Sequence, residues 1–273
     1  MTQYGHPSRV LAVVFDWSGT TIDHGSMAPV EAFVELFRRH GMEITLEEAR
    51  RPMGRYKLDH IRALLAEPDV RERWRHAKGA DPSDDDAMDM YRAFQPIQLE
   101  TIDRYRELIP GASETVAELR RRGIRIGSTT GYWAEATRRC LEAAAEQGYR
   151  PDAVVCPDDV PAGRPEPWML FRNLEILRVY PPAAAVKVGD TPVDMVEARN
   201  AGTWAVGVSL TGNEVGLTRD ALQQIPAAAR RELSDRAMAN LRAAGAHEVV
   251  DDVTMVPAAI DAIEERLRRG ERP

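Results

Sequence analysis

The sequence predicts an α/β protein, with a doubly wound parallel sheet of Rossmann type and an inserted α-helical domain. Three observations predict this class. Short apolar runs alternate with amphipathic helical patterns over most of the chain, one long stretch after the first run has helical patterns only, and polar residues follow successive runs. Strands that alternate with helices at this spacing form parallel sheets joined by right-handed crossovers. Ligands bind such sheets outside the carboxyl ends of the strands.

The strands of the sheet are predicted from apolar runs short enough to be buried on both faces. These runs are residues 10–15, 124–128, 153–156, 184–188 and 204–208, with a weaker one at 248–250. Helical patterns between the runs cover residues 112–122, 133–147, 167–177 and 193–201. The core domain is therefore predicted to comprise residues 1–21 and 107–273.

A helical cap domain is predicted over residues 22–106. Val30, Phe33, Val34 and Phe37 form one apolar helical stripe near its start. Further helical segments are expected near residues 46–50, 56–66, 70–78 and 85–99. An insert after the first strand leaves and re-enters the core at the carboxyl edge of the sheet, where it can act as a lid.

Composition excludes several classes of function. A net charge of -7 and a pI near 5.5 argue against a nucleic-acid or membrane-surface binder, which needs a basic face. The sequence shows no signal peptide and no apolar run of membrane-spanning length, so we expect a cytoplasmic protein. Cys140 and Cys156 lack metal or redox spacing and are expected to be buried, inert thiols.

Three aspartates are predicted to converge at the carboxyl edge of the sheet. Asp16 ends the first apolar run, and Asp190 and Asp194 follow the fourth. Asp16 alone could cap a turn, but converging carboxylates raise each other's pKa unless a cation joins them. Oxygen ligands with an open coordination sphere suit Mg²⁺. We expect Asp16, Asp190 and the backbone carbonyl of Ser18 to bind it. Asp194 either supports a helix start as a helix-dipole or hydrogen-bonding residue, or binds the metal itself or lies just behind its ligands.

An anion site is predicted from the polar residues that follow the second and third runs. Thr130 and Gly131 precede a helical pattern, where a hydroxyl and free amides can hold a phosphoryl group, although they could also form a plain N-cap. Arg164 lies in the stiff segment 159–165. A phosphoryl dianion at Asp16 needs a counter-charge there.

Lys57 is the most informative residue of the insert, because only three of the 36 basic residues are lysines. A desolvated lysine can lose its proton and attack a carbonyl, whereas an arginine cannot. A solvated surface lysine is the alternative. His60 lies three residues on, on the same helix face, as a proton relay or an ordinary half-exposed histidine. Lys187 is expected at the edge of the core beside the acids, and Lys78 at the surface.

Ser18 occupies the position two residues after Asp16. Phosphoryl-transfer enzymes with such a nucleophilic aspartate usually carry a second acid there, which protonates the leaving group. Its absence means either an inactive site or a leaving group that needs no proton from this position.

These motifs resemble the haloacid dehalogenase superfamily and, within it, the phosphonatase family of phosphonoacetaldehyde hydrolases. The resemblance covers residues 10–218 and is carried by residues 15–21, 51–64, 126–132, 157–165 and 189–194. It implies Mg²⁺, a helical cap with a Schiff-base lysine at Lys57, and a homodimer that associates through the caps. Met53, His60 and Tyr132 match pocket positions. Arg164 in place of the common lysine, and Ser18 in place of the acid, both fit this family.

The resemblance implies hydrolysis of the carbon–phosphorus bond of phosphonoacetaldehyde, with a small phosphonate as substrate and no nucleic acid or membrane as partner. A Lys57 imine would let the carbon leave as an enamine while Asp16 attacks phosphorus. An alternative is a Mg²⁺-dependent phosphatase or phosphomutase, which would want the acid that Ser18 replaces. A silent binding protein, the third reading, would have a damaged site. Asp16, Thr130, Arg164 and Asp190 are all present.

Overall fold

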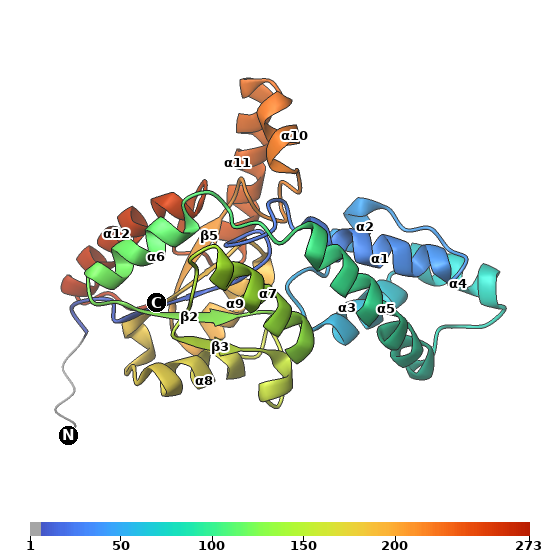
Figure 1. Cartoon of the computed structure of the whole chain (residues 1–273), viewed down its shortest axis with the longest axis horizontal. Coiled ribbons are helices and arrows are strands. Elements are labelled where there is room, and N and C mark those ends of the chain that lie inside the picture. The colour runs from blue at the N-terminus through green and yellow to red at the C-terminus, as the bar shows by residue number, and fades with distance from the viewer. Residues whose placement is uncertain (1–6) are drawn as a thin grey trace.

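A computed structural model, which describes residues 7–273, shows a six-stranded parallel sheet between layers of helices (Figure 1). The strands are β1 (Ala12–Phe15), β2 (Arg125–Thr129), β3 (Ala153–Val155), β4 (Ala185–Gly189), β5 (Trp204–Val208) and β6 (Glu248–Val250). Their order is β3-β2-β1-β4-β5-β6, and all neighbours pair in parallel. The predicted fold class is confirmed, with each strand within two residues of its predicted bounds.

Helices cover both faces of the sheet. They are α6 (Ala112–Arg121), α7 (Ala134–Glu146), α8 (Trp168–Leu177), α9 (Pro192–Ala201), α11 (Ala227–Ala243) and α12 (Val256–Arg268). α6 and α12 pack together on one face, and α8, α9 and α11 pack against the other. Side chains alternate along β1 to fill both layers. Phe15 belongs to the large cluster that includes α6 and α12, whereas Val14 meets Leu170 of α8.

The order in which strands are added to the sheet reverses at β1. The strand order runs from β1 outward through β2 to β3 and then resumes on the other side at β4. A crevice forms at such a switch point, outside the carboxyl ends of the two central strands. Asp16 follows β1 and Asp190 follows β4, so these two aspartates lie at the crevice. The amide of Asp16 donates to the Val188 carbonyl at 2.8 Å, and this hydrogen bond fixes the position of Asp16 along β4.

Five helices lie between β1 and α6 and form the group at the right of Figure 1. They are α1 (Met27–Arg39), α2 (Leu46–Arg50), α3 (Lys57–Ala66), α4 (Pro68–Lys78) and α5 (Asp84–Arg104). We call them the helical insert. Phe33 of α1 stacks on Phe94 of α5 at 4.5 Å, and Phe94 also meets Trp133 before α7. One apolar cluster therefore runs from the insert into the core. The boundaries at residues 21/22 and 106/107 stay predictions, and residues 1–6 lie outside the described part.

The last part of the chain holds helices that the sequence patterns did not predict: α10 (Arg219–Gln224), α11 and α12. α11 is 17 residues long, yet it buries only Ser234, Ala237 and Leu241, so its apolar signal is weak. Short 3₁₀ turns occupy Pro157–Asp159, Pro182–Ala184 and Val253–Met255. Within residues 7–273 no helix is both long and apolar enough to span a bilayer. Cys140 and Cys156 are buried and unpaired.

Candidate active site

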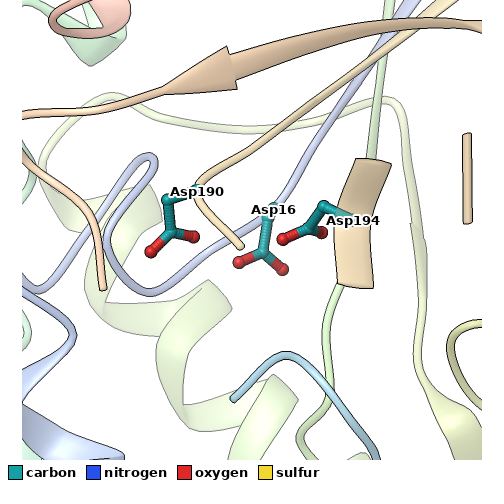
Figure 2. Close-up of side chains that lie close together, drawn as sticks. All are labelled: Asp16, Asp190 and Asp194. Atoms are coloured by element: carbon teal, nitrogen blue, oxygen red, sulfur yellow. The ribbon is translucent and has the colours of Figure 1, made fainter. Parts of the chain in front are cut away.

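Three carboxylates meet at the crevice (Figure 2). Asp16 lies between Asp190 and Asp194 in this view, and one oxygen from each residue lies within 4.8 Å of the others. All three side chains are buried. The structure therefore brings together the aspartates that the sequence predicted to converge.

Asp190 is held from three directions. Its carboxylate accepts the Asn213 amide at 2.7 Å, the Thr20 hydroxyl at 3.2 Å and the Ser26 hydroxyl at 3.4 Å. Burial, together with the charges of Asp16 and Asp194, raises the pKa of Asp190 well above its ordinary value. An anion at this position consequently needs a cation close by.

Asp194 supports a helix start, one of the roles considered for it, and its role toward a metal stays a prediction. It forms a capping box with Thr191 at the start of α9, in which the Thr191 hydroxyl donates to Asp194 Oδ2 at 2.6 Å. Its other oxygen lies 3.0 Å from Arg164 Nη1 and 3.0 Å from Lys187 Nζ. Burial alone would raise the pKa of Asp194, but these two cations lower it. Asp194 is thus already neutralised by protein groups.

Arg164 binds the nucleophile candidate directly. Its Nη2 donates to Asp16 Oδ1 and to Thr129 Oγ1, both at 2.7 Å, and its Nε lies 3.0 Å from Glu197 Oε2. Burial raises the pKa of Asp16, the nearby Asp194 adds to the rise, and Arg164 opposes it. The Arg164 side chain is only 1% exposed, so its guanidinium is a fixed, desolvated counter-charge.

Two further residues of this cluster, Thr129 and Glu197, were not predicted. Lys187 Nζ donates to Thr129 Oγ1 at 2.7 Å and lies 3.6 Å from Glu197 Oε2. Glu197 is fully buried, and burial raises its pKa even beside the two cations. Glu197 follows Asp194 by one helical turn, and this spacing is the signal in the sequence that could have identified it. Lys187 lies beside the acids, as its position in the sequence indicated.

The charges of the cluster test whether a divalent cation fits. Four buried carboxylates, those of Asp16, Asp190, Asp194 and Glu197, face two buried cations, Arg164 and Lys187. Asp16, Asp194 and Glu197 lie against these cations, whereas Asp190 lies among neutral donors. Oxygen atoms of Asp16 and Asp190 converge at the crevice, so the residues present fit a divalent cation such as Mg²⁺.

Replacing Lys187 with methionine is expected to lower the free energy of unfolding by about 3–5 kcal/mol, because two buried carboxylates lose a cation. Methionine is of similar length, so lost packing adds little. Urea unfolding followed by circular dichroism measures the change. Lys78→Met on the surface of α4 is the matched control and is expected to stay within about 0.5 kcal/mol. A loss below about 1 kcal/mol for Lys187→Met would show that the pairing is not needed.

Lys57 is the first residue of α3 and is buried, with 3% exposure. Its Nζ lies 5.0 Å from the centre of the Tyr132 ring, 5.7 Å from that of Phe33 and 4.0 Å from Met53 Sδ. Burial lowers the pKa of Lys57 to about 8, although the charge of Asp16 opposes this shift. The amine therefore lies in an apolar pocket, and the surface alternative for Lys57 is excluded.

His60 is fully buried behind Lys57 rather than half-exposed. Its ring stacks on Phe33 at 3.8 Å, and Nε2 lies 2.9 Å from the Ala49 carbonyl. A carbonyl can only accept, so Nε2 carries the proton and Nδ1 is an acceptor. Burial and the positive charge of Lys57 lower the pKa of His60 well below its ordinary value. The ring is therefore neutral.

The Ser18 hydroxyl donates to Asp23 in a short hydrogen bond. Asp23 also accepts the amides of Met27 and Ala28 at 2.9 and 3.1 Å, so it caps the start of α1. Burial raises the pKa of Asp23 to about 7. This carboxyl is the acid nearest to Ser18, but both of its oxygens are engaged.

Close backbone contacts bring the insert onto the core. A Cβ atom on Gly131 would lie 2.4 Å from the Arg55 carbonyl oxygen, and one on Gly54 would lie 2.5 Å from Thr191 Oγ1. Gly54 also has φ +93°, which glycine adopts freely. Thr130 accepts the Tyr132 amide at 3.1 Å. α7 begins only at Ala134, and the Ala134 amide donates a hydrogen bond to the Asp158 carboxylate at 2.9 Å.

A cavity of about 20 Å³ remains between the insert and the core, roughly the space of one water molecule. The residues around it include most of the predicted site: Asp16, Ser18, Met53, Lys57, Thr130, Gly131, Tyr132 and Arg164. Larger cavities, such as one of about 320 Å³ beside Arg104 and Arg219, lie elsewhere. The small cavity is lined by both Asp16 and Lys57.

Comparison with known proteins gives a consistent result. A family model for haloacid dehalogenase-like hydrolases matches residues 10–202. A phosphonoacetaldehyde hydrolase-like protein of Syntrophobacter fumaroxidans is 46% identical, over 97% of this chain and 95% of its own. A phosphonoacetaldehyde hydrolase of Bacillus cytotoxicus is 45% identical, over 94% and 98%. The crystal structure of a phosphonoacetaldehyde hydrolase-like protein from Oleispira antarctica has a TM-score of 0.97 and 40% identity, over 100% and 99%.

Proposed function

The chain belongs to the haloacid dehalogenase-like hydrolases, and on that premise we propose that it hydrolyses phosphonoacetaldehyde to acetaldehyde and phosphate. The observation that carries the proposal is the pairing of two groups around one small cavity. Asp16 supplies a carboxylate from the core, and Lys57 supplies a desolvated amine from the insert. An amine is what a carbon–phosphorus bond next to a carbonyl needs, because a bare carbanion is a very poor leaving group.

The first step belongs to Lys57. The neutral amine adds to the aldehyde carbon, and uptake of one proton with loss of water leaves a protonated imine that joins Nζ to the substrate. Its positive charge draws electrons from the carbon–phosphorus bond. Met53 and the Tyr132 ring exclude bulk water around Nζ, which keeps the amine reactive.

The second step belongs to Asp16. Its carboxylate attacks phosphorus, the carbon–phosphorus bond breaks, and the bonding pair moves into the carbon–carbon bond as the iminium becomes an enamine. The product on the protein is an aspartyl phosphate. Arg164 balances the phosphoryl charge beside Asp16, and Thr130 with Gly131 lines the same cavity.

The remaining steps restore both residues. Protonation of the enamine at carbon gives an imine, and water hydrolyses it to acetaldehyde and the free Lys57 amine. A second water cleaves the aspartyl phosphate and releases phosphate. Met53, His60, Tyr132 and water are the candidates for the proton transfers. Of these, His60 is neutral in this arrangement, so it acts by accepting a proton.

We propose that Asp16, Asp190 and the Ser18 carbonyl hold Mg²⁺, with Asp194 just behind them. When bound, the ion supplies positive charge that neutralises the carboxylates and the phosphoryl oxygens. The convergence of these carboxylates supports this assignment, as does burial, which raises the pKa of Asp16 and of Asp190 and which a bound cation would oppose. We also propose that residues 22–106 act as the cap and that two chains associate through their caps as a homodimer.

The rate of Lys57 modification is expected to depend on pH through the lysine itself. Burial lowers the pKa of Lys57 to about 8, so below that pH the ammonium form dominates and cannot attack. Trapping by phosphonoacetaldehyde and borohydride should therefore accelerate about tenfold per pH unit up to about pH 8 and then level. Mass spectrometry at timed intervals measures the rate. A trapping rate that keeps rising up to pH 10.5, the ordinary pKa of lysine, would contradict the lowered pKa expected for a buried Lys57.

Phosphate-ester hydrolysis is less well supported. It needs an acid near position 18, and the nearest candidate, Asp23, has both oxygens committed to Ser18 and to the first turn of α1. The two functions are separated by one experiment. Borohydride inactivation that needs phosphonoacetaldehyde and labels Lys57 supports the proposal. Turnover of phosphate esters with no Lys57 adduct would favour the alternative.

A further inference from the structure

Arg50, the last residue of α2, ties the insert to a loop of the core. Its Nη1 donates to the Gly25 carbonyl at 2.8 Å and to Asn213 Oδ1 at 3.2 Å, and its Nη2 donates to the Gly216 carbonyl at 3.0 Å. Asn213 Nδ2 returns a hydrogen bond to the Arg50 carbonyl at 3.4 Å. Arg50 and Asn213 thus bind each other in both directions.

The same loop of the core, residues 212–216, rests on Asp190. The Asn213 amide donates to Asp190 Oδ2 at 2.7 Å. Both ends of the loop are glycines in close contact. A Cβ atom on Gly212 would lie 2.4 Å from the Asp190 Cβ, and one on Gly216, where φ is +67°, would lie 2.6 Å from Arg50 Nε. The loop is therefore packed between the carboxylate of Asp190 and the guanidinium of Arg50.

Arg50 also fixes the segment that leads to Lys57. The Met53 amide donates to the Arg50 carbonyl at 3.0 Å, and Met53 Sδ lies 4.0 Å from Lys57 Nζ. One residue of the insert is thus connected on one side to the reactive amine and on the other to Asp190. Neither Arg50 nor Asn213 lines the cavity that Asp16 and Lys57 share.

We propose that Arg50 and Asn213 are positioning residues that couple closure of the insert over Lys57 to the geometry of Asp190. The inference rests on the proposed function for the roles of Lys57 and Asp190. When the insert is closed, the loop holds Asp190 in place for a cation. When the insert opens, Arg50 leaves the loop and Asp190 loses this support. Because coupling is reciprocal, a cation at Asp190 also favours the closed insert.

Calorimetric titration of substrate-free protein with MgCl₂ tests the first half of the coupling. We expect Arg50→Met to raise the Mg²⁺ Kd about tenfold, the size of effect known for residues behind metal ligands. Arg51→Met is the matched control, because Arg51 is exposed and its partners among the described residues are the carboxylates of Glu47 and Glu67. Asn213→Ala keeps the amide that binds Asp190 but removes the side-chain pair, and should weaken binding in the same direction. The double variant should bind no more weakly than Arg50→Met alone.

Acetylation of Lys57, with exposed Lys78 as the internal reference, tests the second half. MgCl₂ should slow Lys57 acetylation in the wild type and in Arg51→Met, and should lose this effect in Arg50→Met. A Mg²⁺ Kd unchanged within about twofold in both Arg50→Met and Asn213→Ala would overturn the proposal. So would full additivity of the two changes. Neither measurement uses phosphonoacetaldehyde. If the protein failed to turn over that substrate, the proposed function would be wrong, but the results on coupling would still hold.

Discussion

Replacing Lys57 with arginine is expected to lower the kcat for phosphonoacetaldehyde by ~10⁴-fold or more, the scale of loss when the residue that forms a covalent intermediate is removed. Arginine keeps the positive charge and most of the length, but it stays protonated and cannot form an imine. The other two lysines lie elsewhere, since Lys187 pairs with Asp194 and Lys78 is exposed on α4. Phosphate release from the purified variant measures the effect, and borohydride should leave no adduct on the protein.

The matched control is Lys78→Arg, because Lys78 is exposed at the end of α4 and lies over Trp74. It should keep wild-type turnover and still be trapped at Lys57. Turnover by Lys57→Arg at the wild-type rate would rule out imine catalysis and, with it, the proposed reaction.

Replacing Asp16 with asparagine is expected to abolish phosphate release, again by ~10⁴-fold or more, because the amide cannot attack phosphorus. The imine step does not need Asp16. The variant should therefore still be labelled at Lys57 by phosphonoacetaldehyde and borohydride, even though the carbon–phosphorus bond stays intact. The mass of the trapped adduct should include the phosphonate group, which distinguishes a block at the second step from a loss of binding.

Asp89→Asn serves as the control for this variant, since Asp89 is an exposed residue of α5 that pairs with Arg92. It should behave as the wild type in both assays. If Asp16→Asn released phosphate normally, the nucleophile would have to be a different group. If it gave an adduct without the phosphonate group, the carbon–phosphorus bond would break without Asp16.

The sheet could be predicted because its strands are continuous apolar runs that end in polar residues. Asp16 and Asp190 were found in this way: each directly follows a buried strand, and the parallel topology brings the two ends together. Lys57 was found for a different reason, since a lysine stands out in a chain whose basic residues are nearly all arginines.

Most of the supporting residues could not be predicted from local patterns. Glu197 had one local signal, its spacing of one helical turn from Asp194, but Thr129 and Glu197 acquire their roles through Arg164 and Lys187, which come from other elements of the fold. Asn213 acts partly through its backbone amide, which any residue except proline carries. α11 was missed for a related reason. Most of its surface faces water, so its sequence shows little of the apolar spacing that marks a packed helix.

The close approach of Gly54 and Gly131 has a consequence for how the enzyme could evolve or be engineered. At Gly131 the wall of the pocket is main chain, because a side chain there would meet the Arg55 carbonyl, whereas Gly54 packs against the Thr191 hydroxyl. Trimming side chains therefore cannot widen the pocket at Gly131. Under the proposed function, we expect acceptance of bulkier aldehydes at this point to need a longer segment between α2 and α3 rather than a point substitution.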